Sequence, residues 1–123
     1  YTFIYSDTNN DRAYNGTLSC TGIDECREKS LIRGGVVINR LCVIDLSGGN
    51  LNCFGGSGLK YMTLTYVRPN PEPIIKVFNT VNNELGGGPW KTAYIELRSL
   101  NGTLMYVTTD SVSGVITLQN TMP

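Results

Sequence analysis

The sequence predicts an all-β domain of about seven antiparallel strands. Three observations predict it: short runs in which apolar and polar residues alternate, many β-branched residues within these runs, and Gly/Pro/Asn-rich stretches between them. The predicted strands are residues 1–5, 35–46, 59–67, 74–80, 92–99, 104–110 and 114–119. The last three follow one another across short turns at 100–102 and 111–114, so we expect them to form a meander of hairpins.

Helix is scarce in the sequence. Residues 22–32 carry five closely spaced charged residues and are the one segment that could turn into a helix, of about two turns at most. The stretches at 47–58, 68–73 and 81–90 are predicted loops because they are rich in Gly, Pro and Asn. Since proline cannot donate to a ladder, residues 68–73 must form an edge or a connection between strands.

Length and composition predict one domain, residues 1–123, and argue against catalysis. Ten basic residues balance ten acidic ones, so no net field draws nucleic acid or anionic lipid. The chain contains no histidine, which removes the commonest general base and the commonest transition-metal ligand. The carboxylates are scattered along the chain. We therefore expect that the protein is not an enzyme and needs no catalytic cofactor.

The four cysteines predict an oxidising compartment. They are Cys20, Cys26, Cys42 and Cys53. A zinc site would need all four thiolates at unusual separations, so two disulfides are the better interpretation of an even count in a small chain. Three pairings are possible; the favoured one joins Cys20 to Cys26 and Cys42 to Cys53. Disulfides place the protein outside the cell or in the cell envelope, and four reduced, buried thiols are the alternative.

Three side chains with oxygen ligands stand at alternate positions near the start: Asp7, Asn9 and Asp11. This spacing opens a calcium loop of the EF-hand kind, which also needs glycine at its sixth position and glutamate at its twelfth. Those positions hold Arg12 and Leu18 instead. A structural calcium ion is therefore one candidate, completed by backbone carbonyls or another carboxylate. The other is a polar turn, in which Asp and Asn bond their own backbone.

The only tryptophan, Trp90, follows a run of glycines and a proline in "GGGPW". A Gly-rich loop with an aromatic residue can form a carbohydrate site, but no acidic or amide residue stands beside Trp90 in the sequence. The favoured interpretation is that Trp90 folds back over the core.

Three stretches, taken in order, carry a resemblance to a known family. The first is "YTFIYSDTNNDRAY" (1–14), the second "LKYMTLTYVRPNPEPII" (59–75), and the third "TAYIELRSLNGTLMYVTTDSVSGVITLQ" (92–119). Their order and spacing resemble the soluble β-rich heads of bacterial type IV pilin-like proteins, the minor pilins and pseudopilins of the GspH/FimT kind. No one of the motifs is diagnostic alone, and together they cover about half of the chain.

The resemblance implies a structural role. Heads of this family follow an N-terminal helix that anchors the subunit in the membrane and packs in the filament core, so the whole subunit would have an α+β pilin fold. That helix is not among these residues, and it would cover one face of the sheet. The implied function is a subunit of a type IV pilus or of a filament like that of type II secretion, acting in adhesion, secretion or DNA uptake. Its partners would be other pilin or pseudopilin subunits, and it would meet the membrane only through the helix.

One departure from the family disfavours direct binding of nucleic acid. The FimT-like DNA receptors are thought to use basic residues near the final hairpin. The matching stretch, residues 108–119, contains Asp110 and neither lysine nor arginine, and phosphate contacts need positive charge. The competing class is a secreted, disulfide-stabilised β-sandwich effector or toxin-like protein from a eukaryotic pathogen, which shares the size and the cysteine count.

Overall fold

The computed structural model of this protein describes residues 2–5, 9, 11–12, 14, 19–20, 25–47, 51–54, 61–67, 69, 72–80, 83–86 and 88–122. Every regular element in these residues is a β-strand, which confirms the all-β prediction. The strands are β1 (Thr2–Tyr5), β2 (Cys26–Ser30), β3 (Val37–Asp45), β4 (Leu51–Phe54), β5 (Tyr61–Tyr66), β6 (Pro73–Thr80), β7 (Asn83–Glu84), β8 (Trp90–Arg98), β9 (Leu104–Asp110) and β10 (Ile116–Gln119). None of the described residues forms a helix that is long and apolar enough to cross a membrane.

Each of the seven predicted strands coincides with an observed one, and β2, β4 and β7 are additional. The helical interpretation of residues 22–32 is wrong for the part that the structure describes. Residues 26–30 form β2 instead, and they pair antiparallel with β1, with Phe3 opposite Lys29. Hydrogen bonds to a neighbouring strand therefore decide the conformation of this charged segment, against its weak local preference.

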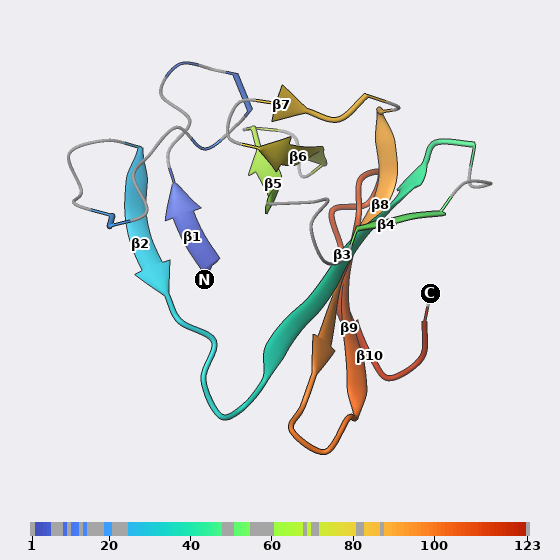
Figure 1. Ribbon diagram of the computed structural model, residues 1–123. Helices are drawn as coiled ribbons and strands as arrows, with labels where there is room; N and C mark the ends of the chain where they lie inside the picture. The colour runs from blue at the N-terminus through green and yellow to red at the C-terminus, as the bar shows by residue number, and fades with distance from the viewer. Residues whose placement is uncertain are drawn as a thin grey trace.

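The strands form three antiparallel sheets (Figure 1). The largest has the order β10-β9-β8-β3-β4, the second has the order β5-β6-β7, and β1 and β2 form the third. The predicted meander is confirmed, because β8, β9 and β10 are neighbours in sequence order. Its first strand, β8, pairs with β3, which lies far from it in the sequence; the pairing runs from Val37 opposite Arg98 to Asp45 opposite Trp90.

The main core lies between the five-stranded sheet and β6, which makes this part of the molecule a β-sandwich. Ile75 and Val77 of β6 pack against Val43 of β3 and Ala93 of β8, and the indole of Trp90 closes the same cluster. In Figure 1 the end of the five-stranded sheet that is farther from β6 extends away from the sheet of β5, β6 and β7. A second cluster, which includes Cys42, Tyr94 and Tyr106, is buried on the opposite face of the five-stranded sheet.

Both predicted disulfides are present, in the favoured pairing. Cys20 is bonded to Cys26 at the start of β2, with 5.2 Å between their Cα atoms. Cys42 is bonded to Cys53, and these two residues stand directly opposite one another on β3 and β4, 4.1 Å apart at Cα. The alternative of four reduced thiols is therefore not found. Two disulfides indicate an oxidising environment, outside the cell or in its envelope.

Candidate functional site

The N-terminal polar loop forms a local turn where the structure describes it. The side-chain oxygen of Asn9 accepts the backbone N–H of Asp11 at 3.2 Å, and its amide donates to the Asp11 carboxylate at 3.3 Å. This is the arrangement by which Asn and Asp stabilise turns. Asp7, the third predicted ligand, lies outside the described residues. Within those residues, no group of three Cys, Asp or Glu side chains stands close enough to hold a metal ion.

The same loop is docked on the sheet of β5 and β6 through its carbonyl groups. Lys76 Nζ donates to the carbonyl of Asp11 at 2.8 Å. The hydroxyls of Thr63 and Thr65 donate to the carbonyl of Arg12 at 3.0 and 3.4 Å. These carbonyls are the groups that could complete a calcium shell, and the ammonium group of Lys76 already supplies a positive charge beside them. The described geometry therefore favours the turn, and calcium binding stays a prediction.

A calcium titration separates the two interpretations. We expect no change in melting temperature when millimolar calcium is added, because Asn9 and the two carbonyls already have hydrogen-bond partners. Magnesium at the same concentration controls for ionic strength. A melting temperature that rises with calcium but not with magnesium would establish the metal site, since a ligand of the folded state stabilises it by mass action.

A buried carboxylate lies on the face of the five-stranded sheet that is opposite β6. The side chain of Glu96 in β8 is only 2% exposed, and Arg40 reaches its Oε2 with both Nε and Nη2 at 3.0 Å. Asn39 donates to Oε1 of the same carboxylate. Tyr106, directly across from Glu96 on β9, donates a further hydrogen bond. The carboxylate is thus fully paired.

An irregularity in β3 brings two donors to the same carboxylate. The register with β8 shifts between Ile38 and Arg40, so Asn39 is an extra residue in the ladder. Such a bulge changes the direction in which side chains point. As a result Asn39 and Arg40, neighbours in sequence, both reach Glu96.

The ionisation of Glu96 indicates a structural role. Burial alone would raise the pKa of this carboxyl group, but the hydrogen bonds from Asn39, Arg40 and Tyr106, together with the charge of Arg40, outweigh burial and hold the pKa below its ordinary value. A carboxylate that stays ionised and has all its donors in place is a poor proton donor or acceptor near neutral pH. The cluster is therefore suited to fixing the register of β3, β8 and β9.

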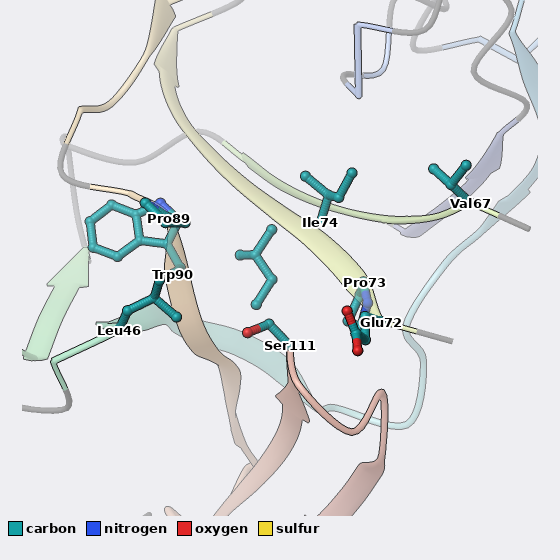
Figure 2. Close-up of a pocket in the computed structure, with 9 residues that line it drawn as sticks. Leu46, Val67, Glu72, Pro73, Ile74, Pro89, Trp90 and Ser111 are labelled. Atoms are coloured by element: carbon teal, nitrogen blue, oxygen red, sulfur yellow. The ribbon is translucent and has the colours of Figure 1, made fainter. Parts of the chain in front are cut away.

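A cleft with a volume of about 280 Å³ opens beside Trp90. Figure 2 shows Leu46, Pro89 and Trp90 on one side of it, with Ile74 and Val67 across from them and Ser111 and Glu72 near its polar end. Trp90 is only 6% exposed, so the indole forms a wall and offers no open ring face for a sugar to stack on. The prediction that Trp90 folds over the core is confirmed.

In the final hairpin, the acidic residue Asp110 stabilises the turn between β9 and β10. One carboxylate oxygen of Asp110 accepts the backbone N–H groups of Val112 and Ser113 at 2.9 and 2.8 Å. These hydrogen bonds, that of Ser113 foremost, hold the pKa of Asp110 below its ordinary value. The tip is therefore a turn that carries a negative charge, and the absence of direct nucleic-acid binding stays a prediction.

Among the described residues, an aliphatic patch lies on the five-stranded sheet and is here called the apolar face. Residues that are paired in register share a face of a sheet, and this patch continues the side on which Ala93 is buried beneath β6. Its members are Ile38, Leu41, Ile95, Leu97, Met105, Val107, Ile116 and Leu118. Each of them is partly or largely exposed, and Ile116 and Leu118 on β10 are 59% and 63% exposed.

Comparison of the chain with protein-family models, with curated proteins and with solved structures finds no match. Function is therefore inferred from the geometry of this chain. Sequence alone did not predict the Glu96 cluster or the apolar face, because both depend on which strands are neighbours and in which register. A partial signal was the alternation within single strands: "GVITLQ" places Ile116 and Leu118 on the same side of a strand, and "TAYIELRS" does the same for Ile95 and Leu97.

Proposed function

We propose that this domain is the head of a pilin-like structural subunit, which assembles into a filament outside the cell or in its envelope and catalyses no reaction. The apolar face is the observation that carries the proposal. Together with the resemblance of residues 1–14, 59–75 and 92–119 to pilin-like heads, it suggests a type IV pilus or a filament like that of type II secretion. The work of such a filament would be adhesion, secretion or DNA uptake, and its other subunits would be the partners.

The apolar face is large enough to support assembly. The eight aliphatic side chains of the apolar face come from β3, β8, β9 and β10. The paired positions between them on this side of the sheet hold no charged residue. Fully burying one such side chain contributes about 1.5–3 kcal/mol, so covering the exposed members would contribute several kcal/mol. Soluble monomers rarely leave a contiguous apolar patch of this kind without a partner.

The proposed cover for this face is the N-terminal helix that pilin-like subunits carry ahead of their heads. A helix that packs on a sheet needs an aliphatic surface on that sheet, and the apolar face supplies one on the four adjacent strands. In this proposal the head meets the membrane only through that helix, and neighbouring subunits hold it in the filament.

The test places a charge on the apolar face of the full-length subunit in its own host. Leu118→Asp is expected to reduce incorporation into filaments about tenfold or more, because the carboxylate would have to be buried without a partner. The matched control is Val112→Asp, at a side chain that is 61% exposed in the β9–β10 turn and outside the apolar face. Immunoblotting of sheared filaments measures both variants.

The melting temperatures of the variant heads show whether a loss of incorporation reflects weaker assembly or a less stable fold. Both substitutions fall on exposed positions, so the melting temperatures of the two variant heads should stay close to that of the parent. Equal incorporation of Leu118→Asp and the parent would contradict the proposal. A protein found secreted as a free monomer, with no filament, would support the effector or toxin-like class instead.

A further inference from the structure

Among the described residues, one edge of the strand β6 is paired for only part of its length. Along its first edge it pairs with β5 from Pro73, opposite Tyr66, to Phe78, opposite Tyr61. Along its second edge β7 pairs only near the end of β6, where Phe78 stands opposite Glu84. Within the described part of the chain, residues 73–76 have no strand partner on this second edge.

The backbone groups that face this open edge can be identified. The carbonyl of Val77 accepts the backbone N–H of Leu85 at 2.8 Å, so the N–H and C=O of Val77 point toward the β7 side. Alternate residues of a strand point their backbone groups to the same side. The N–H and C=O of Ile75 therefore face the open edge, and so does the C=O of Pro73, which has no N–H.

Two adjoining hollows run along the same edge. The cleft of Figure 2 is one of them, and the other has a volume of about 470 Å³ and extends toward Lys76 and Leu85. Both are lined by Ile74 and Ile75, together with Pro89 and Trp90. Successive side chains of a strand point to opposite faces, so a hollow that touches both Ile74 and Ile75 must lie at the edge of β6 and not over one face.

The charges at the two ends of this groove differ. At the Lys76 end, the ammonium group is paired with Glu84 at 3.3 Å. At the other end the exposed side chain of Glu72 lines the cleft, and in the described part of the chain it has neither a hydrogen bond nor an ion pair. Between the two ends the lining side chains that the hollows share are apolar: Ile74, Ile75, Pro89 and Trp90. A segment that fills the groove would thus present apolar side chains to these residues and a basic side chain to Glu72.

We propose that the open edge of β6 binds an extended peptide segment of a partner protein by strand addition, with alternate apolar side chains of that segment in the groove and a lysine or arginine of the segment beside Glu72. Such binding draws its affinity from main-chain hydrogen bonds and its specificity from the side-chain pockets. The bound segment would lie in line with β7, beyond Leu85, and would run antiparallel to β6 as β7 does. Its C-terminal end would then lie beside Glu72, so its basic residue would stand at that end. This site is separate from the apolar face and does not depend on filament assembly.

The probe is a synthetic peptide, acetyl-Thr-Val-Thr-Val-Thr-Lys-amide, titrated into the protein. Trp90 is the only tryptophan of the chain and lines both hollows, so its fluorescence reports on the groove. We expect a saturable change in fluorescence. A peptide with glutamate in place of lysine should bind about threefold more weakly, the effect of one exposed ion pair. A peptide with proline in place of the second valine should bind about fivefold more weakly, because it cannot donate to the ladder.

A charge reversal provides the matched variants. Glu72→Lys should reverse the preference, so that the glutamate peptide binds more tightly than the lysine peptide. Glu28→Lys makes the same change at an exposed residue of β2, outside both hollows, and should leave the preference as it is.

Three results would overturn the proposal. The first is no saturable change with the lysine peptide at millimolar concentration. The second is equal binding of the proline peptide, which would mean unspecific apolar contact. The third is dimerisation of the protein that rises with concentration and competes with the peptide, since a second copy of the chain would then hold the edge.

Discussion

Replacing Arg40 by methionine is expected to lower the free energy of unfolding by about 3 kcal/mol at pH 7. The change leaves the Glu96 carboxylate, whose side chain is 2% exposed, without its cationic partner. Methionine keeps the apolar stem of the side chain, so the effect reports on the charge. Urea unfolding followed by the fluorescence of Trp90 measures it.

The converse substitution, Glu96→Gln, should lower the free energy of unfolding by a smaller amount. In Glu96→Gln the side chain that loses its partner is Arg40, which is 34% exposed and can be solvated. We therefore expect Arg40→Met to be the more destabilising of the two. The double variant should lose less stability than the sum of the two single losses, because both act on one interaction.

The dependence on pH gives a further check. The folded-state pKa of Glu96 lies below its ordinary value, so this group contributes stability above about pH 4.5, and the contribution is lost as the pH falls through the folded-state pKa. In Arg40→Met, the hydrogen bond and the charge of Arg40 that lower the pKa of Glu96 are lost while burial still raises it, so the folded-state pKa of Glu96 should rise. The stability gap between the parent and Arg40→Met should therefore shrink as the pH falls from 7 toward 3. A gap that stays constant over this range would show that the ion pair is not its cause.

Removing the disulfide between Cys42 and Cys53 should have a comparable effect. Replacing both residues by alanine is expected to lower the free energy of unfolding by about 3 kcal/mol, since the bond closes a segment with a sequence separation of 11 and restricts the unfolded chain. The sulfur of Cys53 also contacts the hydroxyl of the buried Tyr94 at 3.8 Å, and that contact is lost with it.

The second disulfide serves as the comparison. The bond between Cys20 and Cys26 closes a shorter segment, with a sequence separation of 6, so removing it should cost about 2 kcal/mol. Thiol labelling of the native protein should find no reactive cysteine until both reductant and denaturant are added. Four reactive thiols in the native protein would contradict the bonded state and, with it, the inferred compartment.

The positions of most strands could be predicted from the local sequence. Alternating residues predicted β8, β9 and β10, and the turns between them use glycine where the backbone requires it: Gly102 and Gly114 have φ values of 85° and 71°. The favoured disulfide pairing also followed from local spacing, because each bond closes a short segment.

Pairings between distant strands could not be read from the sequence. The charged segment of β2 is a strand only because β1 lies beside it. The Glu96 cluster requires β3 and β8 to be neighbours with one extra residue at Asn39, and a single sequence does not determine that register. The groove at β6 depends in the same way on where Trp90 packs, so neither site could be derived from residue patterns.

The start of the complete coding sequence tests the pilin-like assignment most directly. For a pilin-like subunit, the codons upstream of Tyr1 should encode a processing site followed by about twenty apolar residues with an early glutamate, enough for a helix that spans a membrane. A cleavable secretion signal that ends immediately before Tyr1 would contradict the assignment.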